Sequence, residues 1–126
     1  MFSTLGISQL VDYARSLGIT INTTYENSSY VEFKTRTIFI SASDSLLVDG
    51  NFSVQEIYQA TFSHEIGHLF AYIETAEGDA DYDHYCERTA WSLGEDIYKQ
   101  VYGEAPSSFY EIKKQCLLSH GYWREA

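Results

Sequence analysis

The stretch that decides the fold of this chain lies near its centre and reads Thr61-Phe62-Ser63-His64-Glu65-Ile66-Gly67-His68-Leu69. Upstream of it, Ser53 and Glu56 have the spacing of a capping box, in which a serine hydroxyl and a glutamate side chain satisfy the first backbone N–H groups of a helix. Apolar residues then recur at helical spacing through the stretch. The sequence therefore predicts a helix from Ser53 to Ile73.

Two histidines and a glutamate inside this helix have the spacing of a metal site. His64 and His68 are four positions apart, so in a helix of about 3.6 residues per turn their rings lie on one face and can reach one cation. Glu65 lies beside that cation. This H-E-x-x-H pattern is typical of zinc hydrolases, in which the glutamate is the general base. Iron, cobalt and manganese accept the same ligands, and a pair of core histidines without metal is the alternative interpretation.

The length and composition of the chain indicate one domain. It has 126 residues, of which 44% are hydrophobic, enough for a single core over residues 1–126. No apolar run approaches the ~18 residues that cross a bilayer, and the first residues do not form a signal peptide, so we expect a cytoplasmic protein. Cys86 and Cys116 are too few for a disulfide scaffold and are expected to be free, buried thiols.

The charge of the chain limits its partners. Eighteen acidic and eight basic residues give a formal net charge of −10, which disfavours nucleic acids and anionic membranes and favours a basic protein or peptide substrate. Six acids and no lysine or arginine lie from Glu74 to Glu87. A calcium loop starting at Asp79 would need glycine and glutamate where His84 and Ala90 stand. We therefore expect a solvated acidic rim that attracts a basic strand.

The flanking segments predict an α+β domain. A first helix is expected before Gly18, a residue suited to a helix C-terminal cap. β-branched and aromatic residues then predict a small, mostly antiparallel sheet of three strands, and two further helices follow the motif helix. The expected helices are Ile7–Leu17, Ser53–Ile73, Asp83–Tyr102 and Ser107–Ser119, and the expected strands are Ile19–Tyr25, Tyr30–Phe33 and Thr37–Ser41.

A zinc site needs a third protein ligand, and Glu87 is placed to supply it. It lies 19 positions after His68, on a helix that can pack across the motif helix and present its carboxylate to the metal. Ala90 is small enough to let the helices approach, and Trp91 is expected to wall the site. Asp83 is the alternative third ligand.

In motif and layout the chain resembles the ImmA/IrrE family of small zinc metallopeptidases, many of which are encoded by phages and mobile elements. The likeness covers about residues 7 to 100, and the interval between His68 and Glu87 is similar to that of gluzincin metallopeptidases. The segments that carry it are Leu17-Gly18-Ile19, Ile38-Phe39-Ile40-Ser41, Thr61 to Leu69 and Glu87-Arg88-Thr89-Ala90. The chain departs from the family at Trp91-Ser92-Leu93-Gly94, where members usually read Asn-x-Phe-Ala.

The resemblance implies a hydrolytic mechanism. Zinc held by the two histidines and Glu87 would activate water, and Glu65 would be the general base and later the proton donor. A donor to the oxyanion is also implied, and His84 and Tyr85 are favoured because they precede Glu87 on the segment that approaches the metal. The other candidates are Tyr82, His120 and Tyr122.

Two functions fit these features. The first is a zinc-dependent endopeptidase that hydrolyses peptide bonds of a specific protein substrate, such as a repressor. The second is a non-catalytic, peptidase-like phage protein that binds or inhibits a host protein. Glu65 favours the enzyme, because a purely structural zinc site has no use for this glutamate.

Overall fold

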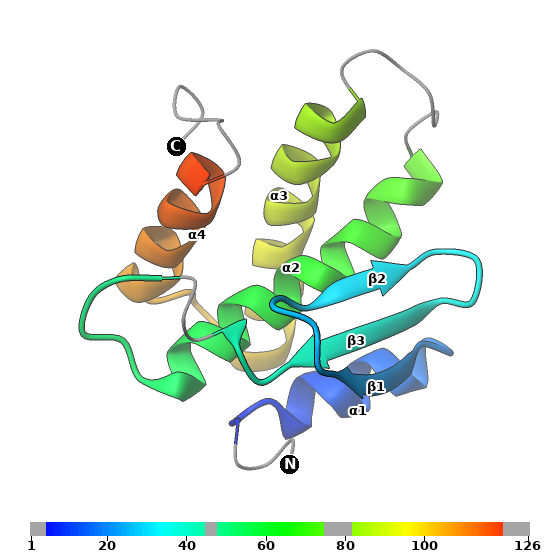
Figure 1. Cartoon of the computed structure of the whole chain (residues 1–126), viewed down its shortest axis with the longest axis horizontal. Helices are drawn as coiled ribbons and strands as arrows, with labels where there is room; N and C mark the ends of the chain where they lie inside the picture. The colour runs from blue at the N-terminus through cyan, green and yellow to red at the C-terminus, as the bar shows by residue number, and fades with distance from the viewer. Residues whose placement is uncertain (1–4, 45–47, 75–81, 120–126) are drawn as a thin grey trace.

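The computed structural model describes residues 5–44, 48–74 and 82–119, and for residues 72–74, 82–86 and 119 it describes the backbone only. Helix α2 runs through the middle of the molecule, with the sheet on one side and helices α3 and α4 on the other (Figure 1). This is the predicted α+β order of a helix, a small sheet and then helices. The elements are α1 (Ser8–Ser16), β1 (Thr20–Thr24), β2 (Tyr30–Glu32), β3 (Thr37–Ser41), α2 (Val54–Glu74), α3 (Tyr82–Tyr102) and α4 (Ser107–Ser119).

Local signals in the sequence set the ends of the helices. The Glu56 N–H donates to Ser53 Oγ at 3.0 Å, and the Ser53 N–H donates to Glu56 Oε1 at 2.8 Å, which confirms the capping box of α2. Gly18 has a φ of 80°, in the left-handed region that favours glycine, and it ends α1. Each predicted boundary lies within one residue of the observed one.

The sheet is mixed, with one antiparallel and one parallel pair of strands. Its order is β1-β3-β2, so β3 is central and β2 is an edge strand. Strand β2 pairs antiparallel with β3, as predicted, and Val31 lies opposite Ile38. Strand β1 pairs parallel with β3, with Ile21 opposite Ile38. The prediction of a mostly antiparallel sheet misses this pair, because β1 and β2 follow each other in the chain but lie on opposite sides of β3.

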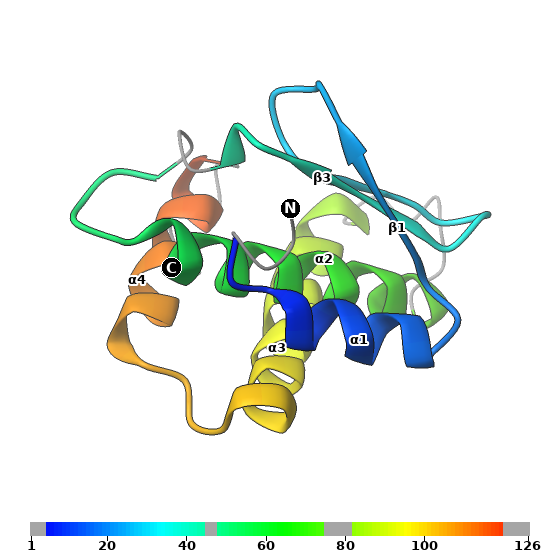
Figure 2. The same ribbon diagram turned by 90° about the horizontal axis from the view of Figure 1, so that it is seen from below.

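Helix α2 lies between two hydrophobic clusters. One joins α1, the sheet and α2 and includes Leu10 and Ile66, and the other joins α2, α3 and α4 and includes Ile57 and Phe109. Figure 2 shows α1 and α2 beneath the sheet, and α3 on the side of α2 that faces away from the sheet. Residues 60–67 are buried around the whole circumference of the helix, so burial extends beyond the one face that helical spacing predicts. The metal motif therefore lies in the interior.

Two glycines let α2 and α3 cross in backbone contact. A Cβ at Gly67 would overlap the carbonyl oxygen of Ala90. A Cβ at Gly94 would lie 2.9 Å from the carbonyl oxygen of Ser63 and 3.0 Å from His64 Cα. These positions leave no room for a side chain, and the crossing brings the first half of α3 against the motif turn of α2.

Replacing Gly67 by alanine should destabilise the protein. In an open helix alanine is favoured over glycine by ~1 kcal/mol, but here the added methyl group meets a backbone oxygen that cannot rotate away. Overpacking of this kind costs about 1–3 kcal/mol or more, so we expect the free energy of unfolding in urea to fall by at least about 1 kcal/mol. Ser92→Ala, on an exposed position of α3, is the control and should keep wild-type stability. A Gly67→Ala protein as stable as wild type would contradict the backbone contact.

Candidate metal centre

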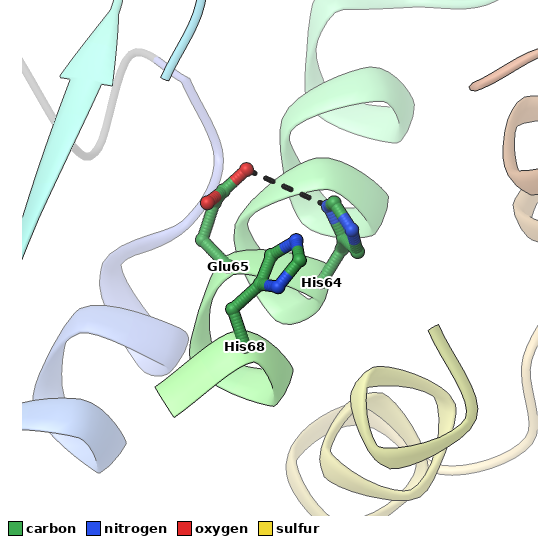
Figure 3. A group of neighbouring side chains, drawn as sticks. All are labelled: His64, Glu65 and His68. Carbon is green, nitrogen blue, oxygen red and sulfur yellow. Dashed lines mark ion pairs between the residues drawn. The ribbon is translucent and has the colours of Figure 1, made fainter. Parts of the chain in front are cut away.

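Helix α2 presents two imidazole rings side by side. The ring centroids of His64 and His68 are 4.4 Å apart, and the ring planes are inclined by 64° (Figure 3). The two residues lie one helical turn apart, as their spacing predicts. His64 is buried and His68 is half-buried, so the pair lies at the inner end of an opening to solvent.

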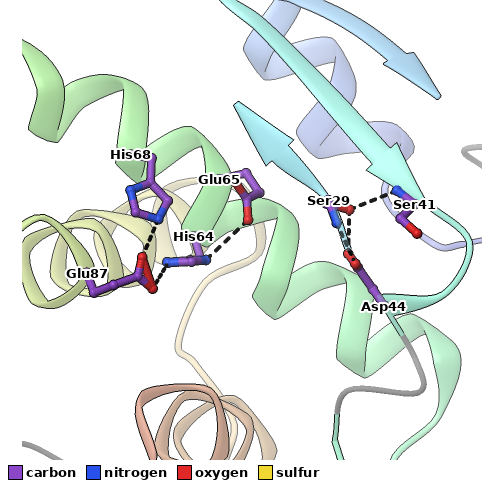
Figure 4. A network of polar contacts seen from close by, with 7 residues as sticks. All are labelled: Ser29, Ser41, Asp44, His64, Glu65, His68 and Glu87. Atoms are coloured by element: carbon purple, nitrogen blue, oxygen red, sulfur yellow. Dashed lines mark hydrogen bonds and ion pairs between the residues drawn. The ribbon is translucent and has the colours of Figure 1, made fainter. Parts of the chain in front are cut away.

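Glu87 of α3 bridges these two rings. Its Oε1 lies 3.2 Å from His64 Nε2, and its Oε2 lies 2.7 Å from His68 Nε2 (Figure 4). The helix crossing thus brings together the three residues predicted as metal ligands.

The donor atoms and their spacing fit a zinc ion. Two ligand atoms that each lie about 2.0–2.1 Å from one tetrahedral ion are about 3.3 Å apart. The separation of His64 Nε2 and Glu87 Oε1, 3.2 Å, already matches this value. The 2.7 Å separation at His68 requires the carboxylate to withdraw by about half an ångström, which a side-chain rotation can achieve. Two imidazoles and one carboxylate are also a ligand set of catalytic zinc sites.

Glu65 lies on the other side of His64. Its Oε1 is 3.5 Å from His64 Nδ1, the ring nitrogen opposite the one that faces Glu87. The donor atoms of His64, Glu65 and His68 lie within 4.8 Å of one another, so Glu65 is a geometric alternative as the third ligand. We assign that role to Glu87, because it contacts the Nε2 atoms of both histidines at shorter distances. Glu65 then lies across the imidazole ring of His64 from the nitrogen that faces Glu87.

Trp91 supports the first histidine directly. Its ring stacks on His64 with centroids 4.3 Å apart and planes 14° from parallel, and it is fully buried. On its other side it meets the ring of Phe109 edge-on. The indole N–H has no hydrogen-bond partner among the described residues, so packing alone holds the ring. The sequence predicts Trp91 as a wall of the site, and the structure shows that its ring stacks on one of the two predicted ligands.

Opposite charges control protonation in the centre. Burial disfavours the charged form of His64, but the hydrogen bonds and negative charges of Glu65 and Glu87 outweigh burial and raise the pKa of His64 to about 9. Burial likewise acts to raise the pKa of Glu87, but its contacts with both histidines hold that pKa well below its usual range. Because metal ions bind neutral imidazole, metal binding here must displace a proton from His64.

A pocket of about 410 Å³ opens onto the centre. The residues of the metal centre line it together with Tyr30 and Val31 of the edge strand β2. It is also lined by Ser29, Asp44 and Thr61, which the sequence did not single out as site residues. Asp44 lies shortly after β3, but an aspartate in a turn is too common to indicate a site.

The half-buried Cys116 of α4 also lines this pocket and forms no disulfide within the described part of the chain. Burial, together with the charges of nearby carboxylates, raises its pKa to about 12. It is therefore protonated near neutral pH and a weak nucleophile.

Several predicted residues lie outside the described part of the molecule. The backbone of α3 includes Tyr82, Asp83, His84, Tyr85 and Cys86, but their side chains are not among those described. His120, Tyr122 and the acidic segment 75–81 lie wholly outside the described residues. The predicted oxyanion donors, the alternative ligand Asp83 and the acidic rim therefore stay predictions.

No known family model matches this chain, and neither a curated protein nor a solved structure shows a significant match to it. The resemblance to the ImmA/IrrE family rests on the motif and the order of elements alone.

In the presence of a chelator, the stability of the protein should fall as the pH rises from about 6.5 to about 9. A histidine whose pKa is raised by folding stabilises the folded state fully below its unfolded pKa, and this contribution is lost as the pH passes its folded pKa. Urea denaturation at a series of pH values measures the effect, and a His64→Gln variant should show a shallower decline. An equal decline in both proteins would mean that another group dominates this pH range.

Proposed function

We propose that this protein is a zinc-dependent metallopeptidase of the ImmA/IrrE type, encoded by a phage or mobile element. One observation carries the proposal. The carboxylate of Glu87 lies 3.2 Å from the Nε2 atom of His64 and 2.7 Å from the Nε2 atom of His68, one turn further along α2, and Glu65 contacts the Nδ1 side of His64. His64, His68 and Glu87 would hold the ion, and Glu65 would serve the reaction.

Zinc held by this ligand set supplies a Lewis acid that polarises a carbonyl group and lowers the pKa of a water molecule. Glu65 would accept a proton from the attacking water and later donate it to the leaving amine. Its carboxylate lines the same pocket as the three proposed metal ligands, which supports this role. Trp91 would keep His64 in position throughout.

The edge of the sheet beside the pocket supports an extended peptide as the substrate. Strand β2 is at the edge of the sheet, and two of its residues, Tyr30 and Val31, line the pocket beside the metal ligands. The backbone N–H and C=O groups on the outer side of an edge strand can pair with an added strand. A peptide bound in this way would run past Glu65, which supports an endopeptidase acting on a protein substrate.

His84 and Tyr85 are our proposed donors to the oxyanion. They lie in the first turn of α3, less than one turn before Glu87. Glu87 would bind the metal, so the start of α3 would lie near the reacting carbonyl. We therefore prefer these two residues to the other candidate donors.

The compartment that we propose is the cytoplasm, where the cysteines would stay reduced. Among the described residues, no helix is both long and apolar enough to cross a membrane. The net charge of −10 favours a basic segment of the substrate over nucleic acid.

One observation favours the second function, a binding protein with a structural metal site. Cys116 lines the same pocket as the three metal ligands. A thiolate as fourth protein ligand would close the site, as in structural zinc centres.

Substitutions of the two glutamates should separate metal binding from catalysis. Mass spectrometry of the intact protein should find one bound zinc in wild type and in Glu65→Gln, and none in His64→Ala or Glu87→Ala. Peptide hydrolysis, followed on a mixed peptide library, should fall by about 10²–10⁴-fold in Glu65→Gln, the usual contribution of a general base.

The opposite pattern of zinc content would contradict the roles that we assign to the two glutamates. If Glu65→Gln lost zinc and Glu87→Ala kept it, Glu65 would be the third ligand. A wild-type protein that stays folded but cannot be loaded with zinc would contradict the enzyme and leave the binding protein.

A further inference from the structure

A buried carboxylate lies at one end of the pocket, away from the histidines. Asp44 is only 2% exposed and lines the pocket. The Ser29 N–H donates to its Oδ1 at 2.8 Å and the Ser29 hydroxyl to its Oδ2 at 2.5 Å. The N–H of Ser41 in turn donates to the Ser29 hydroxyl oxygen at 2.9 Å, which holds the pair in place. Figure 4 shows Glu65 between this pair and the histidine–Glu87 cluster.

The charge of Asp44 is only partly compensated. Its two hydrogen bonds come from neutral groups, and within the described part of the chain no lysine or arginine forms an ion pair with it. Burial raises the pKa of Asp44, and the charge of Glu65 adds to this effect, although the bonds from Ser29 and the charge of His64 oppose it. A buried carboxylate in this position gains free energy from a cation brought to it.

A second polar group in the pocket lacks a partner. The hydroxyl of Thr61 is buried and has no hydrogen-bond partner among the described residues, and Thr61 lines the pocket. It lies one turn before Glu65 on α2. An unmet buried hydroxyl costs free energy that a bound ligand can recover by donating a hydrogen bond to it.

We propose that Asp44 and Thr61 form a subsite for a cationic nitrogen group of the substrate, an inference that rests on the peptidase function proposed above. The pocket carries three carboxylates, Asp44, Glu65 and Glu87, so one divalent ion leaves an excess of negative charge. The apolar walls of β2 suit the methylene stem of a long basic side chain. The same ammonium chemistry could come from a lysine side chain or from the amino terminus of a peptide.

Hydroxamates that differ only in an ammonium group test this subsite. Nα-acetyl-lysine hydroxamate and Nα-acetyl-norleucine hydroxamate both bind zinc through the same group, and only the first carries a charge on its side chain. Isothermal titration calorimetry of the zinc-loaded protein should show the lysine compound binding about tenfold more tightly, as a charge-assisted contact in a shielded pocket allows. Asp44→Asn should abolish the difference without weakening the norleucine compound.

Two further variants supply a control and a second test. Asp12→Asn removes the same charge from an exposed position on α1 and should keep the preference for lysine. Thr61→Val keeps the shape of its side chain and should reduce the preference severalfold. If Asp44→Asn failed to fold, the result for Thr61→Val would decide the matter.

The outcomes separate this subsite from the function on which it rests. Equal affinities of the two compounds in wild type, or a preference unchanged by Asp44→Asn, would overturn the subsite and leave the zinc site intact. Absence of zinc and of any hydroxamate binding would overturn both. A third compound, norleucine hydroxamate with a free α-amine, identifies the source of the ammonium group. If it binds as tightly as the lysine compound, and Asp44→Asn removes this added affinity, the group bound is a peptide amino terminus.

Discussion

The backbone contact between α2 and α3 at Gly67 and Gly94 is the constraint on which the rest of the structure depends. Neither position has room for a side chain, so the two helices cross as closely as their backbones allow. This crossing carries Glu87 to the Nε2 atoms of both histidines, and it lays Trp91 flat on His64. A wider crossing would separate the carboxylate from the rings and leave buried charges without partners.

Stability alone does not explain why the centre is polar. It lies in a helix between two hydrophobic clusters, where charged groups lose their hydration and must pair to be tolerated. Apolar side chains of similar volume often give equal or greater stability than a buried ion pair. The pairing of His64 with two glutamates is better explained by the metal site that we propose, in which Glu87 would be a ligand and Glu65 would act as the base.

Local signals predicted much of this molecule, and long-range packing decided the remainder. The caps at Ser53 and Gly18 act within a few residues, which is why element boundaries were accurate. The close approach of His64 and His68 was predictable because helical spacing places them on one face. The parallel pairing of β1 with β3 depends on which strand fills the middle of the sheet, and no local pattern encodes that choice. The contact of Asp44 with Ser29, fifteen positions away, could not be predicted either, because it also depends on long-range packing.

The proposed peptidase requires an open zinc site with imidazole and carboxylate ligands. X-ray absorption at the zinc edge of the loaded protein reports the ligand atoms directly. We predict two imidazole nitrogens and oxygen ligands at about 2.0–2.2 Å, and no sulfur. A sulfur ligand at about 2.3 Å would place Cys116 or Cys86 on the metal and contradict the proposed peptidase.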